Sequence, residues 1–99
     1  MLYKSRVNLW IWPGEAAWHF VTLPKDQSGE IKKVFGSSAR GFGSLKVKAT
    51  IGKTSWDTSI FPDSKSGCYM LPIKKSVRKA ENIKADDNFE LQIDIKILE

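Results

Sequence analysis

The chain has 99 residues and a formal net charge of +5, with 41% hydrophobic and 27% charged residues. This length fits one small domain with one core, and the composition excludes both a disordered chain and a membrane-embedded one. We expect no membrane helix and no signal peptide, because the apolar runs are short and no cleavage site follows the first of them. Cys68 is the single cysteine, so no intrachain disulfide forms and a reducing, cytoplasmic location is expected.

The first third of the chain predicts two strands and a short helix. Residues 5–12 alternate between aliphatic side chains and polar or tryptophan side chains, which is typical of a strand. Residues 18–23 (WHFVTL) are rich in aromatic and β-branched residues and predict a second strand, which ends at Pro24. Residues 26–35 predict a helix, since their apolar residues share one face and their lysines lie away from it.

A glycine-serine loop, residues 36–44, leads into a predicted β-hairpin. The loop lacks the Gly-Lys-Ser/Thr ending of a phosphate-binding loop and precedes a strand, so we expect a plain connection. Residues 45–51 (LKVKATI) alternate strictly between buried-type and polar residues. Gly52 as the first residue of a two-residue turn favours type II′ geometry, and residues 54–61 form the returning strand.

The last third predicts a strand, a helix and a final strand. Residues 68–71 form the strand, Pro72 opens a helix that runs to about residue 82, and residues 89–98 alternate cleanly. The whole chain then has about six amphipathic strands and one or two short helices. A small closed or nearly closed barrel removes open sheet edges and suits this pattern, so the fold is expected to be mainly β.

Two segments of the chain, residues 18–51 and 67–95, repeat the order strand, proline, helix, loop, strand. Their Leu-Pro steps, at Pro24 and Pro72, lie 48 positions apart, and the strands that begin at Leu45 and Phe89 lie 44 positions apart. A unit this small cannot bury its own apolar face, whereas two units can close around one core with approximate two-fold symmetry. The sequence therefore predicts one domain, residues 1–99, with an internal duplication. The alternative is chance similarity between two strand-helix-strand stretches.

The second segment, GCYMLPIKKSVRKAENIKADDNFELQIDI, resembles the half-barrel of the AbrB/MazE/MraZ-type transcription factors. In that family, half-barrels from two chains form a swapped dimer that binds DNA. The whole chain resembles the family called domain of unknown function (DUF) 1905, through WHFVTLP, EIK, KVKATIG, SIFP, GCYMLPIKKSVRKA and IKADD in that order. This resemblance implies a double-split β-barrel that is AbrB-like, here internally duplicated. The family has no established activity or catalytic residues, so the resemblance leaves the function open.

Basic residues in the second half of the chain are the main candidates for a functional surface. In the predicted helix after Pro72, Ile73, Val77 and Ala80 share one side, and the basic residues lie on the other. Such a face would contact phosphates, together with outward lysines of the 45–51 strand. The alternative is a solvated face whose cations suit the helix dipole. The candidate nucleic-acid-binding residues are Arg40, Lys46, Lys48, Lys74, Lys75, Arg78 and Lys79.

The aromatic residues and the single histidine leave two further questions. Trp10 and Trp12 either pack in the core or form an exposed patch for a partner. His19 has no nucleophile motif beside it, and one histidine with one cysteine argues against structural zinc. The sequence thus predicts a non-enzymatic binding module without metal or cofactor, a monomer or weak homodimer. Its expected partner is nucleic acid, and the alternatives are another protein or a small ligand.

Overall fold

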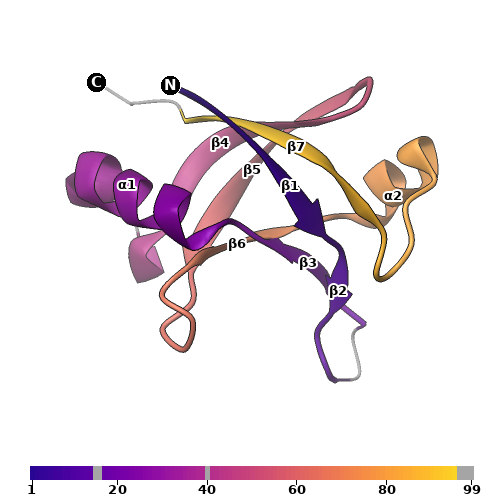
Figure 1. Cartoon of the computed structure of the whole chain (residues 1–99), viewed down its shortest axis with the longest axis horizontal. Coiled ribbons are helices and arrows are strands. Elements are labelled where there is room, and N and C mark those ends of the chain that lie inside the picture. The colour runs from indigo at the N-terminus through magenta and orange to yellow at the C-terminus, as the bar shows by residue number, and fades with distance from the viewer. Residues whose placement is uncertain (15–16, 40, 96–99) are drawn as a thin grey trace.

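The computed structural model describes residues 1–14, 17–39 and 41–95, except for the side chain of Phe42. Seven β-strands and two α-helices occur in this part of the chain (Figure 1). Two short 3₁₀ turns follow the first helix. In chain order the elements are β1 (Leu2–Asn8), β2 (Trp10–Ile11), β3 (His19–Thr22), α1 (Lys25–Phe35), β4 (Leu45–Ile51), β5 (Thr54–Pro62), β6 (Tyr69–Pro72), α2 (Lys75–Glu81) and β7 (Asn88–Ile95).

The strands of the described residues form one antiparallel sheet in the order β1-β7-β4-β5-β6-β3-β2. The two outermost strands of this order, β1 and β2, are separated in the chain by Leu9 alone. Leu9 is held at this corner because its N–H donates to the Asp87 carbonyl (3.0 Å) and its carbonyl accepts from the Asp86 N–H (2.7 Å). The sheet therefore curls back on itself as a half-barrel, with α1 and α2 on opposite sides of it (Figure 1).

The first predicted strand, residues 5–12, is two strands in the structure. The alternation of side chains continues across Leu9, but β1 pairs with β7 whereas β2 pairs with β3. The bend at Leu9 depends on hydrogen bonds from residues 86 and 87, which lie far away in the sequence. As a result Leu9 is fully buried, while Ile11, expected on the same buried side, is 45% exposed.

The prediction that Pro72 opens the second helix is wrong, because Pro72 is the last residue of β6 and pairs with Phe20. The ladder continues one residue further, since the Ile73 N–H donates to the His19 carbonyl (2.9 Å). The helix can begin only after this ladder ends, and α2 accordingly begins at Lys75. The first helix, by contrast, begins directly after Pro24, close to the predicted boundary.

The pairing of strands relates the two repeated segments. In the β3–β6 pair Thr22 lies opposite Met70, 48 positions later, and in the β4–β7 pair Ala49 lies opposite Ile93, 44 positions later. These are the offsets between the two segments in the sequence. An approximate two-fold axis through an antiparallel pair places each central residue opposite its own equivalent. The register is therefore the one that an internal duplication of residues 18–51 and 67–95 requires, and the duplication stays a prediction that this register supports.

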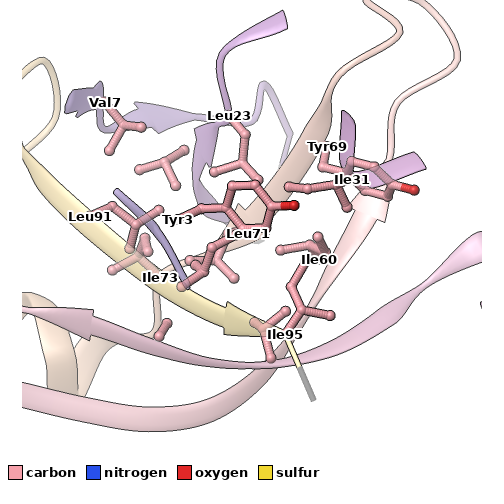
Figure 2. Close-up of a cluster of buried hydrophobic side chains, with 14 of the residues drawn as sticks. Tyr3, Val7, Leu23, Ile31, Ile60, Tyr69, Leu71, Ile73, Leu91 and Ile95 are labelled. Atoms are coloured by element: carbon pink, nitrogen blue, oxygen red, sulfur yellow. The ribbon is translucent and has the colours of Figure 1, made fainter. Parts of the chain in front are cut away.

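The core lies on the concave side of the curled sheet and is closed by aliphatic side chains and two tyrosines (Figure 2), together with Phe35. In β4 the alternate residues from Leu45 to Ile51 are buried and Lys46 and Lys48 are exposed, as their alternation predicts. Side chains from both halves of the chain meet here, so neither half has a core of its own. The labelled members in Figure 2 are Tyr3, Val7, Leu23, Ile31, Ile60, Tyr69, Leu71, Ile73, Leu91 and Ile95.

Tyr3 and Tyr69 are expected to make the fold sensitive to alkaline pH. Both are buried, with 8% and 4% of the side chain exposed. Burial raises the pKa of each above its ordinary value of 10.0, and the nearby charge of Glu30 adds to the rise at Tyr3. The folded state therefore keeps these protons longer than the unfolded state does. Their contribution to stability is fully present below about pH 10 and is lost as the pH rises through the folded-state pKa values.

Thermal unfolding followed by circular dichroism between about pH 8 and about pH 11 measures this effect. We expect a melting temperature that falls above about pH 10. The Tyr3→Phe variant should show a smaller fall, because it removes one of the two raised groups. Equal alkaline slopes in the wild type and the variant would contradict the role given to Tyr3.

Candidate functional site

A groove opens where β5 and β6 separate. These two strands pair only at Phe61–Met70 and Pro62–Tyr69, and beyond this point β6 continues beside β3 while β5 continues beside β4. α2 packs against β5 next to this gap. The result is a surface groove of about 360 Å³, which we call the β5–α2 groove. Its lining includes Trp18, His19, Trp56, Asp57, Lys74 and Arg78.

Arg78 forms one wall of the β5–α2 groove and is held at both ends of its guanidinium. Its Nε donates to the Ile73 carbonyl (3.2 Å), and its Nη1 donates to His19 Nε2 (3.3 Å). His19 Nδ1 lies 2.8 Å from the Ala17 carbonyl. A guanidinium only donates and a carbonyl only accepts, so these contacts place the proton of the neutral imidazole on Nδ1. The side chain of Arg78 is thus half-buried and turned towards β3, and it does not lie on the outer face of α2.

A second groove, of about 540 Å³, adjoins the first along β5, and we call it the β5 groove. Lys46, Ser59 and Phe61 are among its lining residues. Asp57, Thr58 and Pro72 line both grooves, so the two are continuous. The structure therefore brings Lys46, Lys74 and Arg78 to one surface, although they come from β4, the start of α2 and its second turn.

The other predicted site residues lie around this surface or outside it. Lys48 is exposed on β4 and lies opposite Asp57 in the β4–β5 register. Lys75 and Lys79 are exposed on α2 and line neither groove. Arg40 lies outside the described residues. Ile73 and Val77 are buried as predicted, but Ala80 is exposed, so the helix rests on the sheet through its first turn.

Four aromatic rings lie on the outer face of the β2–β3 hairpin, and we call them the aromatic ladder: Trp10, Trp12, Trp18 and Phe20. Trp10 pairs with Phe20, and the Trp12 N–H donates to the Trp18 carbonyl (2.7 Å), so all four side chains point to the same side. The ring centroids of neighbours lie 5.3–6.1 Å apart. Trp12 is 49% exposed and Trp18 is 56% exposed. Of the two tryptophans in the first predicted strand, Trp12 is therefore exposed and does not belong to the core.

The aromatic ladder is attached to the rest of the molecule by its inner members. Trp10 and Phe20 are half-buried, and the Trp10 Nε1–H donates to Thr22 Oγ1 (2.9 Å). Trp18 stacks on Phe20 with an interplanar angle of 15° and also lines the β5–α2 groove. The ladder is therefore continuous with the basic grooves. Sequence reasoning missed Trp18 and Phe20 as partners of Trp12, although alternation along residues 18–23 places them on one face.

Among residues 1–14, 17–39 and 41–95, no group of three or more His, Cys, Asp or Glu side chains is arranged to hold a metal ion. No helix within the described ranges combines the length and the apolar character needed to cross a bilayer.

The curled antiparallel sheet, with its two helices, defines a small mainly-β domain with open grooves on its outside. The chain belongs to the family described as Domain of unknown function (DUF1905), whose model matches residues 6–93. This confirms the family resemblance inferred from the sequence. No curated protein matches the chain. The matched residues include the aromatic ladder, both lysines of the grooves and Arg78, so these features lie within the family domain.

Proposed function

We propose that this domain binds nucleic acid along the β5–α2 and β5 grooves. The observation that carries the proposal is the meeting of Lys46, Lys74 and Arg78, from separate elements, along one continuous surface depression. Cationic side chains that follow a groove suit a chain of phosphates, because each contact releases condensed counterions. The net charge of +5 favours the approach of a polyanion in the same way.

The remaining basic candidates have a supporting role in this proposal. Lys48, Lys75 and Lys79 are exposed and lie on elements that border the grooves, so they extend the positive surface without lining it. Arg40 belongs to the loop before β4 and is included as a candidate of the same kind. Asp57 is the acidic residue in both linings, and Lys48 lies opposite it in the β4–β5 register. Basic side chains therefore outnumber acidic ones along the grooves.

We further propose that the curled sheet is an internally duplicated double-split barrel of the AbrB-like kind. The support is that the β3–β6 and β4–β7 ladders each contain a residue pair related by the offset between the repeats, Thr22–Met70 and Ala49–Ile93. The two helices differ in a way that bears on function. Ser28 and Arg78 are each the fourth residue of their helix, and each donates to the carbonyl five residues earlier. The fourth helical residue is thus a serine in α1 and a cation in α2, although the two lie 50 positions apart and not at the repeat offset of 48.

Binding of a labelled oligonucleotide of about 12 nucleotides, followed by fluorescence anisotropy at about 50 mM and about 200 mM salt, tests the nucleic-acid proposal. We expect affinity to fall steeply as salt rises. The double variant Lys46→Gln/Lys74→Gln should bind more weakly and should lower the slope of log K against log salt by about 1.4 for a single strand.

The matched control is Lys32→Gln/Lys33→Gln. It removes the same charge from exposed positions of α1 that line neither groove. This control should change the slope little. Absence of binding by the wild type at the lower salt concentration, or equal effects of the two double variants, would overturn the proposed role of the grooves.

A further inference from the structure

The aromatic ladder is not used by phosphate binding in the grooves, yet two of its rings, Trp12 and Trp18, are exposed. Trp12 and Trp18 are about half exposed, although the domain has a core in which apolar side chains are buried. Isolated exposed apolar residues are ordinary, but four rings in mutual contact on one face mark an interaction site. The side chains that surround the ladder therefore indicate the chemistry of the molecule that would bind to it.

Cationic side chains lie at both ends of the ladder. At one end Trp18 lines the β5–α2 groove together with Lys74 and Arg78. At the other end Trp10 lines a groove of about 470 Å³ together with Arg6. Each of these two grooves also has one acidic residue, Asp57 and Asp86 respectively, so neither end is purely basic. The surface thus runs from a cation, over four aromatic rings, to two further cations.

We infer that the aromatic ladder binds the unpaired bases of a single-stranded nucleic acid whose phosphates lie over Arg6 at one end and Lys74 and Arg78 at the other. This inference rests on the proposed nucleic-acid function and specifies its ligand. Single-strand binding surfaces combine aromatic platforms for the bases with a basic path for the backbone, and the ladder with its flanking grooves has both components. Arginine and tryptophan faces add cation–π attraction to the same ligand.

The geometry favours a single strand over a duplex. Bases in a duplex are stacked at about 3.4 Å along each strand, and their faces are covered by their neighbours. The unpaired bases of a single strand can present a face to an exposed ring, so the exposed rings of the ladder suit a single strand. Trp12 and Trp18 are the exposed platforms, while the half-buried Trp10 and Phe20 hold them in position.

A pair of probes with equal charge separates stacking from phosphate binding. The first is a thymine oligonucleotide of about 12 nucleotides, and the second is an abasic oligomer with the same number of phosphates. We expect the wild type to bind the thymine probe at least about 25-fold more tightly than the abasic one, because two stacked bases contribute about fivefold or more each, and also more tightly than a duplex of the same length. Trp12→Ala and Trp18→Ala should each weaken thymine binding by about fivefold to a hundredfold and leave abasic binding almost unchanged.

The matched control is Ile11→Ala. Ile11 is an exposed apolar residue in the same hairpin, 45% exposed, and alternation places it on the face opposite to Trp10 and Trp12. This variant should bind both probes like the wild type. Circular dichroism of all three variants confirms that they are folded, which is expected because the replaced side chains are exposed.

The outcomes distinguish this inference from the proposal on which it rests. If the wild type binds the thymine and abasic probes with equal affinity, and both tryptophan variants keep these affinities, base binding by the ladder is overturned. Phosphate binding in the grooves is left intact by this result. If neither probe binds at low salt, the nucleic-acid function itself fails. If, in addition, a proline-rich peptide quenches the fluorescence of the wild type but not that of the tryptophan variants, the ladder is a protein-binding surface and the inference is wrong.

Discussion

Replacement of Gly52 by alanine is expected to lower the free energy of unfolding by about 2–3 kcal/mol, a large share of the total for a domain of this size. Gly52 begins the two-residue turn between β4 and β5 and has a φ of +57°, a left-handed conformation that costs an L-residue about 1–2 kcal/mol. An added Cβ would also overlap Glu81 Oε1 and lie 2.9 Å from Glu81 Cδ. The carboxylate would have to move, and it accepts a hydrogen bond from Thr54 Oγ1 (2.7 Å) that would then be lost.

Gly67→Ala is the matched control for this effect. Gly67 also has a positive φ, +74°, but a Cβ there would meet nothing within 4 Å. Its substitution should therefore cost only the backbone part, about 1 kcal/mol. Urea unfolding of both variants measures the difference. In the double variant Gly52→Ala/Glu81→Ala, the added cost of the alanine at position 52 should fall to the value found for Gly67→Ala. Equal costs for the two single variants would show that Glu81 has no part in the effect.

The strands with strict alternation could be predicted from the sequence almost to the residue. β4 has its predicted boundaries, and the returning strand β5 ends one residue later than expected. In these strands one face packs on the core and the other faces water. The alternation of apolar and polar residues is therefore enough to predict the strand. The hairpin turn at Gly52 could also be predicted, because its conformation depends on residues inside the turn.

Features that depend on contacts between distant residues could not be predicted. The bend that separates β1 from β2 is made by hydrogen bonds to Leu9 from residues 86 and 87. Alternation also assigns side chains to two faces without saying which face is buried, and this is why the exposure of Trp12 stayed open. Helical geometry placed Arg78 with the outward lysines, but its long side chain reaches back to His19 on β3, 59 positions earlier. The candidate grooves arise from these long-range contacts.

The two halves of the chain differ most at the positions that build the candidate site. Their Leu-Pro steps are alike, and Leu23 and Leu71 are both fully buried at equivalent positions. The helices then diverge: the fourth helical residue is a buried serine in α1 and a half-buried arginine in α2. Arg78 lies beside the gap between β5 and β6, and Ser28 lies inside the core. The side chain of Ser28 thus bridges two strands, whereas the side chain of Arg78 lines a groove.

Replacement of Ser28 by alanine is expected to lower the free energy of unfolding by about 1–3 kcal/mol. Ser28 is 1% exposed, and its Oγ lies between two strands, accepting from the Tyr69 N–H (3.0 Å) and donating to the Leu23 carbonyl (3.5 Å). The Leu23 N–H already donates to the Tyr69 carbonyl (2.9 Å), so the serine hydroxyl occupies the place of the reciprocal ladder hydrogen bond. Alanine at this position would leave a buried N–H without its acceptor, which is the costly case.

Ser76→Ala is the control, because Ser76 is an exposed serine on α2 and should tolerate alanine to within about 0.5 kcal/mol. Urea unfolding of the two variants gives the comparison, and hydrogen exchange gives a local one. In Ser28→Ala the Tyr69 amide should lose protection more than the amides of β4 and β7, since the damage is at the end of the β3–β6 ladder. A loss of amide protection spread evenly over the sheet would mean that Ser28 does not join β6 to α1. The same would follow if Ser28→Ala lowered the free energy of unfolding no more than Ser76→Ala does. The local loss would instead show that the side chain of a helix completes the pairing of β3 and β6.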